Sequence, residues 1–199
     1  FLVENKSLHI IGTSPEKVVI ITNAGYGLLF LNSKNSTISN VTITGGVRDT
    51  SGDATNGGIV LKYSHVLIEN CVISNDTVRF ANDPVVGICG IVIREGSFAL
   101  IRNNIIVRNT WDGIALYRGA NAVIEDNIIQ TGRGAGIGVT WNANALIVRN
   151  KVSGFWKGIG TVGNSKAEVY NNAVFDNLGW GIVISGNSEM QLINNVITR

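Results

Sequence analysis

The sequence has little proline, cysteine, histidine, methionine or charge. Its 199 residues include two prolines, two cysteines, two histidines and one methionine. Two cysteines cannot supply a disulfide framework, and so few prolines exclude Pro-rich linkers. A net charge of +2 gives no electrostatic reason to expect nucleic acid or an anionic membrane as a partner. The apolar runs, such as residues 18–21, are far too short to span a bilayer.

The few metal-binding side chains predict no metal centre. His9 and His65 lie in different repeats, and Met190 is the only methionine, so the chain offers no cluster of soft ligands. Cys71 and Cys89 could form one bridge or remain two buried thiols, and we expect thiols. We therefore predict no required cofactor.

Apolar residues and glycine are plentiful. Hydrophobic residues make up 45% of the chain and charged residues 15%, so the chain is expected to be ordered. The 24 glycines suit many tight turns within regular structure. We expect one domain over residues 1–199. Because the chain starts at Phe1 without Met or a signal sequence, we expect a processed product or a piece of a longer chain.

Glycines recur ahead of short apolar triplets. The later ones are separated by 22 or 23 residues, and the first two intervals are 31 and 32 residues. Each glycine precedes two apolar residues that stand two positions apart, which indicates a strand too short to be a helix. These glycines are Gly27, Gly58, Gly90, Gly113, Gly136, Gly158 and Gly181.

Each repeat contains two further apolar positions, five residues apart, which predict two more strands. In residues 112–133 these are Ile124 and Ile129. Between them, five consecutive repeats carry asparagine, which can pass amide hydrogen bonds from coil to coil at a strand spacing of about 4.8 Å. The predicted structural column is Asn104, Asn127, Asn150, Asn172 and Asn195, preceded by Val41 and Cys71.

Three short strands in each 22–23 residues, without a helical segment, predict an all-β parallel β-helix of about eight coils. A sandwich would show hairpin turns, and a leucine-rich repeat would show a helical half. The repeat pattern resembles the right-handed parallel β-helix (pectin lyase-like) superfamily, and within it NosD-like and CASH-type modules with PbH1 repeats. The resemblance covers residues 18–199 and implies the right-handed fold.

Two repeats are lengthened at the same corner, by residues 45–57 and 76–87. Insertions on one face of a solenoid commonly carry binding, so we expect them to project side by side. Residues 1–21 read as a lead-in coil with strands at 8–11 and 18–21. Both ends expose strand edges, where we expect more chain, an added domain or an oligomer partner.

The corner ahead of each repeat glycine collects aromatic and charged residues. Trp111 and Trp156 both stand two positions before their glycine and two coils apart, which places them about 10 Å from each other. This spacing suits aromatic rings that stack on sugars along a groove. Alternatively, the tryptophans only cover the apolar interior beneath the turns. The predicted substrate-binding residues are Trp111, Trp156, Trp180, Tyr117, Arg79 and Arg108.

Catalysis would require more than a groove. Glycoside hydrolysis needs two carboxylates about 5–10 Å apart, and Asp83 and Asp112 belong to adjacent coils at this corner. A lyase or epimerase needs a base and a group that neutralises a uronate carboxylate, often Ca²⁺ held by aspartate oxygens. Lys157 or Arg133 with Asp112 would supply parts of such a site. These four are the candidate catalytic residues, and Ca²⁺ is expected only for a lyase or epimerase.

Motifs of the resembled enzymes are missing. Polygalacturonases carry Asn-Thr-Asp, Asp-Asp and Gly-His-Gly, whereas this chain has Asn-Thr-Trp-Asp at residues 109–112 and neither of the other two. The Trp-x-Asp-His and Arg-x-Pro-x-x-Arg strings of pectate lyases are also missing. The Asp-Pro-His of alginate epimerases becomes Asp83–Pro84–Val85. Each departure argues against the corresponding activity.

Two classes of function therefore remain open. The first is an extracellular, cell-surface or periplasmic protein that binds, and in one version processes, a polysaccharide along this corner. The second is a non-catalytic solenoid that serves as an adhesin, spacer or assembly module. The first class predicts that Trp111 and Trp156 line one groove and are exposed to solvent, beside residues 76–87.

Overall fold

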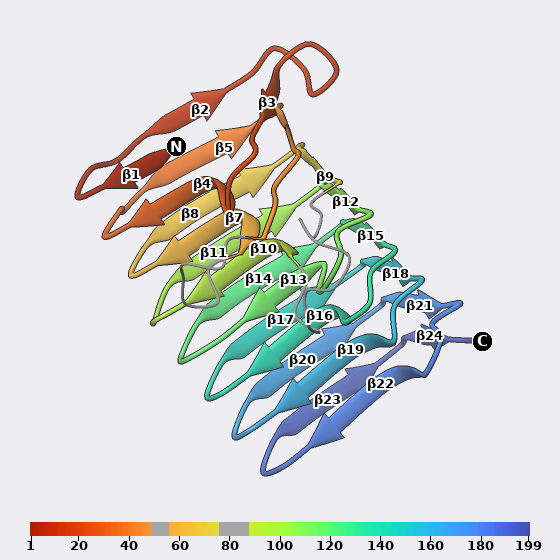
Figure 1. The fold of residues 1–199 in the computed structure, drawn as a ribbon. Helices are drawn as coiled ribbons and strands as arrows, with labels where there is room; N and C mark the ends of the chain where they lie inside the picture. The colour runs from red at the N-terminus through yellow and green to blue at the C-terminus, as the bar shows by residue number, and fades with distance from the viewer. Residues whose placement is uncertain (49–55, 76–87) are drawn as a thin grey trace.

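The protein is described here by a computed structural model covering residues 1–48, 56–75 and 88–199, and within these ranges the chain forms strands and turns but no helix. Successive coils stack along one axis, from the N-terminal coil to the C-terminal coil (Figure 1). Each coil contributes one strand to each of three eight-stranded sheets, and every strand pairing is parallel. The fold is a parallel β-helix of eight coils, as predicted.

The first sheet, sheet A, starts at the repeat glycines. Its strands are β1 (Leu2–Glu4), β4 (Tyr26–Leu31), β7 (Gly57–Lys62), β10 (Cys89–Arg94), β13 (Ile114–Leu116), β16 (Ala135–Thr140), β19 (Lys157–Val162) and β22 (Trp180–Ser185).

The second sheet, sheet B, follows sheet A within each coil. Its strands are β2 (His9–Ile11), β5 (Ser36–Ser39), β8 (His65–Glu69), β11 (Phe98–Arg102), β14 (Asn121–Glu125), β17 (Asn144–Val148), β20 (Lys166–Tyr170) and β23 (Glu189–Ile193).

The third sheet, sheet C, completes each coil. Its strands are β3 (Val19–Ile21), β6 (Thr42–Thr44), β9 (Val72–Ser74), β12 (Ile105–Val107), β15 (Ile128–Gln130), β18 (Lys151–Ser153), β21 (Ala173–Phe175) and β24 (Val196–Ile197).

Strand β1 was not predicted, because no repeat glycine precedes it. Val3 is nevertheless buried and lies opposite Phe30 of β4, so the first coil is complete. The lengthened corners lie between β6 and β7 and between β9 and β10. Of these, residues 49–55 and 76–87 lie outside the described part of the chain, so their expected position is not tested.

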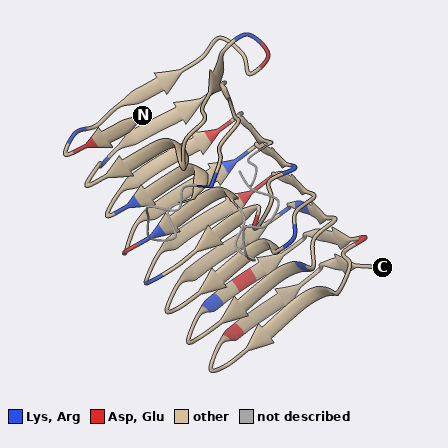
Figure 2. Cartoon of the chain, in the orientation of Figure 1, with Lys and Arg blue, Asp and Glu red and all other residues tan. Residues whose placement is uncertain are grey.

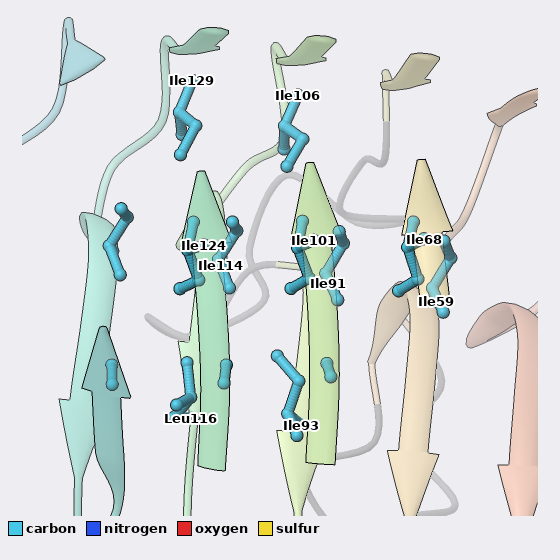
Figure 3. Packing of buried hydrophobic residues seen from close by; sticks show 14 of the residues in the cluster. Ile59, Ile68, Ile91, Ile93, Ile101, Ile106, Ile114, Leu116, Ile124 and Ile129 are labelled. Atoms are coloured by element: carbon cyan, nitrogen blue, oxygen red, sulfur yellow. The ribbon is translucent and has the colours of Figure 1, made fainter. Parts of the chain in front are cut away.

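The interior is built from columns of identical or similar apolar side chains. Ile68, Ile101 and Ile124 are paired in register in sheet B, and Ile106 and Ile129 are paired in sheet C. All are fully buried, and they lie in rows from coil to coil (Figure 3). Like side chains stack at the strand spacing of about 4.8 Å, so each coil buries its apolar side chains against the coils on either side. One coil alone therefore cannot form this core.

The asparagine column lies at the corner between sheets B and C. Asn127 donates from Nδ2 to the carbonyls of Ile101 and Glu125, both at 2.9 Å, and to Oδ1 of Asn150 at 2.9 Å. Its own Oδ1 accepts the backbone N–H of Asn104 at 3.0 Å. The pattern repeats to Asn195. At the Cys71 position the column changes in its side chain only: the backbone N–H of Cys71 still donates to Oδ1 of Asn104, but a thiol replaces the amide. Burial raises the pKa of this thiol to about 11.

The residue before each column position has the left-handed backbone that turns the corner. Its φ lies between 53° and 57° at Asn70, Asn103, Asp126, Arg149 and Asn171. Asparagine and aspartate tolerate this region better than most residues, which explains the Asn-Asn pairs in the sequence. The bend therefore falls on the preceding residue, while the column asparagine supplies the hydrogen bonds.

The repeat glycines are required because neighbouring coils approach closely where sheet A begins. A Cβ at Gly113 would lie 2.7 Å from the carbonyl oxygen of Gly136 in the next coil and would also collide with Ile129. A Cβ at Gly136 would meet Gly158 and Val152 in the same way. This corner therefore has room for backbone alone.

Charged residues gather at turns and strand ends, and most of the ribbon carries none (Figure 2). Arg102 pairs with Glu69 at 2.8 Å on the solvent side of the asparagine corner. No helix among the described residues has the length and apolar character needed to cross a membrane.

Candidate functional site

A groove of about 340 Å³ lies on the outer face of sheet A, over its later coils. We call it the sheet A groove. Its floor is formed by the outward positions of β16 and β19, with Val183 of β22 at one end and Tyr117 at the other. The full lining is Trp111, Asp112, Tyr117, Arg133, Gly134, Ala135, Gly138, Thr140, Trp156, Lys157, Gly160, Val162 and Val183.

The groove begins beside a small apolar cluster on the same outer face. Val60, Cys89, Val92 and Ala115 are buried there, separate from the main core, and Trp111 and Tyr117 pack against them. Cys89 and Cys71 are both buried and form no disulfide, as expected. The outer face of sheet A is therefore apolar and buried at β7 and β10. At β16 and β19 the same face carries the groove.

Asp112 is the buried carboxylate of the groove, with 8% of its surface exposed. It stands just before Gly113, and its Oδ1 accepts the backbone N–H of Ala135 in the next coil at 2.6 Å. A Cβ at Gly134 would occupy the position of this carboxylate, so the glycine makes room for it. Burial raises the pKa of Asp112 to about 6, while the Ala135 and Tyr117 hydrogen bonds and the Lys157 charge oppose the rise.

Tyr117 closes one end of the groove. Its hydroxyl donates to Oδ2 of Asp112 at 3.4 Å, and its ring lies 5.6 Å from that of Trp141 between centroids. Burial, together with the nearby Cys89 and Asp112, raises the pKa of Tyr117 well above its ordinary value. The hydroxyl therefore remains protonated at neutral pH and acts as a hydrogen-bond donor to the carboxylate.

Two cations line the same groove. Lys157 is half-buried and stands in register with Ala135, so it lies one coil beyond the residue that Asp112 contacts. Arg133 is exposed at the corner ahead of β16. Together with Asp112 they bring two positive charges and one titratable carboxyl into one hollow, which suits an anionic ligand.

The tryptophans differ in exposure. Trp156 is 48% exposed at the groove wall, whereas Trp111 is half-buried against the outer apolar cluster. Both line the groove, and Trp156 is the more exposed of the two. Trp180 is exposed and stands edge-on to Trp156 with ring centroids 5.4 Å apart, just outside the lining.

Other candidates lie elsewhere. Arg108 is exposed at the end of β12 and donates from Nε to Oδ1 of Asn75 at 2.9 Å, so it faces away from the groove lining. Arg79 and Asp83 belong to residues 76–87, outside the described chain. The Asp83–Asp112 separation, on which the hydrolase hypothesis depends, thus stays a prediction.

Gly138, Gly160 and Thr140 line the groove but were not predicted. A signal for the glycines existed in the apolar triplets: the middle residue is valine or alanine in most coils and glycine in Ile137–Gly138–Val139 and Ile159–Gly160–Thr161. A missing side chain at an outward strand position marks a site where something else approaches.

The described residues do not build a metal site. Nowhere in residues 1–48, 56–75 and 88–199 do three or more His, Cys, Asp or Glu side chains gather as metal ligands would. The groove lining contains one carboxylate, whereas Ca²⁺ takes six to eight oxygen ligands. The Ca²⁺ expected for a lyase or epimerase therefore does not fit these residues.

The stacked parallel coils form a β-helix, and the residues that differ from coil to coil line the groove on the outer face of sheet A. The chain belongs to the family described as "right handed beta helix region", which matches it over residues 5–137 and again over 57–199. No curated protein matches the chain in sequence.

Two solved structures match the chain, and the first of them has the same fold. One is a double mutant of the periplasmic alginate epimerase AlgG, with a TM-score of 0.80 and 16% identity over 99% of this chain and 47% of that chain. The other is the A-module of the Azotobacter vinelandii mannuronan C-5 epimerase AlgE6, with a TM-score of 0.41 and 15% identity over 96% of this chain and 77% of that one. This chain spans about half the length of AlgG.

Proposed function

We propose that this β-helix binds an acidic polysaccharide in the sheet A groove. The observation that carries the proposal is the joint presence of an exposed Trp156 ring, the cations Arg133 and Lys157, and the buried Asp112 in one open hollow. An aromatic face packs against the apolar face of a sugar, and cations pair with its carboxylates. The fold shared with a protein described as a periplasmic alginate epimerase supports the same class of ligand.

Asp112 and Tyr117 give the groove a pair of proton-carrying groups. A carboxyl with a pKa of about 6 exchanges protons near neutral pH, and Tyr117 is its hydrogen-bond donor. In the processing version of the function, Asp112 moves a proton on the bound sugar while Lys157 and Arg133 neutralise the uronate carboxylate. We place the protein outside the cytoplasm, in the periplasm or at the cell surface, where such polymers occur.

Binding is tested with polymannuronate and polygalacturonate against neutral dextran, by affinity electrophoresis and calorimetry. The wild type should retain the polyuronates selectively, with affinity falling as salt rises. Trp156→Ala should weaken binding about tenfold, because truncating an aromatic contact residue commonly costs more than 1 kcal/mol. Phe98→Ala is the matched control: Phe98 is 40% exposed on sheet B, outside the groove, and its loss should leave binding unchanged.

Processing is tested on the same polymers. Incubation with the wild type should shorten the polyuronate or change its uronate composition, and Asp112→Asn should abolish the change while retaining binding. If the wild type retains no polyuronate at any salt concentration, the proposal is wrong, and the structural-solenoid hypothesis replaces it.

A further inference from the structure

Two outward-facing glycines in the floor of the groove stand out against their own column. Gly138 of β16 and Gly160 of β19 are paired in register, and their neighbours in the column are Ala115 on one side and Val183 on the other. Earlier coils carry Val60 and Val92 at the same position. Glycine in a strand interior weakens the strand, so two in adjacent coils need a reason.

The backbone does not supply that reason. Neither Gly138 nor Gly160 has the positive φ that favours glycine, in contrast to turn glycines such as Gly163 at 66°. Both continue an ordinary parallel ladder with their neighbours. Any residue could adopt their conformation.

Packing supplies it only in part. A Cβ at Gly160 would have the Lys157 Cδ and the Val183 carbonyl oxygen as its nearest neighbours, both at 3.9 Å, an ordinary contact distance. At Gly138 the nearest atom would be Oδ2 of the buried Asp112 at 3.3 Å, a tight contact with a side chain, so packing gives part of the reason at Gly138 and none at Gly160. Two residues earlier, by contrast, a Cβ at Gly158 would collide with the next coil. Gly158 is therefore required by the fold, and Gly160 is not.

The absence of side chains at Gly138 and Gly160 creates the sheet A groove. The 340 Å³ of the groove lie over these two glycines, between the Trp156 wall and Tyr117, and Val183 fills the same column in the next coil. That volume is at the small end of the range of about 300–1,000 Å³ for ligand sites. The open part of the floor is two coils long, or about 10 Å at the strand spacing.

The geometry points to Gly138 and Gly160 as specificity-determining residues that let a sugar ring of the acidic polysaccharide lie directly on the backbone of β16 and β19, with its carboxylate toward Lys157. This inference rests on the proposed function. Val183 closes the floor, so the site accepts a short segment of the polymer. The length of that segment is set by how many consecutive coils carry glycine in this column.

The test places a side chain in the groove floor at position 160. In Gly160→Val, a residue that the column already carries at Val60, Val92 and Val183 replaces the glycine. Binding of polymannuronate and polygalacturonate should weaken at least tenfold, while the thermal midpoint stays the same or rises, since valine favours strands. Gly160→Ala adds the Cβ alone and should weaken binding less. Glu168→Val adds the same side chain to the exposed outer face of β20 in the same coil and should not affect binding.

A second variant lengthens the open part of the groove floor. Val183→Gly opens the column by one coil, and the shortest uronate oligosaccharide that binds with full affinity should become longer by about one residue. Unchanged binding in Gly160→Val, or a lowered thermal midpoint in Gly160→Ala, would overturn the inference.

The two proposals fail in different ways. If the wild type binds neither polyuronate, the proposed function is wrong and the inference falls with it. If the wild type binds and Trp156→Ala weakens binding, but Gly160→Val binds like the wild type, only the role of the glycines is wrong.

Discussion

Two corners of the coil differ in how their residues vary from one coil to the next. Between sheets B and C, asparagine recurs from Asn104 to Asn195 and makes the same hydrogen bonds in every coil. Between sheets C and A, consecutive coils place Asp112, Ala135, Lys157 and Trp180 at one register position. Repetition at the first corner stabilises the stack, and variation at the second gives the outer face its chemistry.

The largest expected effect comes from breaking the repeated corner. Asn127→Ala removes three donated and two accepted hydrogen bonds and leaves buried amide and carbonyl groups without partners. Each unsatisfied buried group costs about 1–3 kcal/mol, so we expect a loss of about 4 kcal/mol in the free energy of unfolding. Urea denaturation measures it. Polyuronate binding to the remaining folded protein should be unchanged, and a parallel loss of binding would show that the corners are coupled.

The next largest effect concerns Asp112 at the variable corner. Its pKa is about 6 in the folded protein and 3.8 as the ordinary value, so the folded state holds the proton more tightly. This contribution to stability is fully present below about pH 4 and is lost as the pH rises through 6, a change of about 3 kcal/mol.

Asp112→Asn should remove this dependence. The difference in unfolding free energy between wild type and variant, measured in urea at pH 4, 5, 6 and 7, should shift in favour of the variant as the pH rises. A difference that does not vary with pH would mean that Asp112 titrates normally.

The smallest effect is expected on the solvent side of the asparagine corner. Arg102 is 40% exposed and pairs with Glu69 at 2.8 Å, only one residue before the turn that leads to Asn104. Exposed ion pairs contribute about 0.5 kcal/mol, so Arg102→Ala should barely move the urea midpoint. A loss comparable to that of Asn127→Ala would contradict the view that the buried hydrogen bonds, rather than the surface charges, hold this corner.

Much of the fold follows from local patterns. Ile124 and Ile129 were assigned to strands from their spacing alone, and they pair in register with Ile101 and Ile106 because a parallel ladder stacks equivalent positions. Strand β1 was not predicted, because no repeat glycine precedes it. Six of the residues expected at the site line one groove, and Arg108 does not, while their roles in binding or catalysis stay predictions; the six are Trp111, Asp112, Tyr117, Arg133, Trp156 and Lys157.

By itself, the sequence determined the period, the inward columns and the corner at which side chains vary, since these depend on spacing within a coil. Only the tertiary structure decided that Asp112 is buried against Ala135, that Tyr117 donates to it, and that Gly138 and Gly160 open a hollow between them. The burial of Asp112 and the hollow depend on contacts between coils, at separations of 22 or 23 residues, and the Tyr117 hydrogen bond depends on how its coil folds back on Asp112.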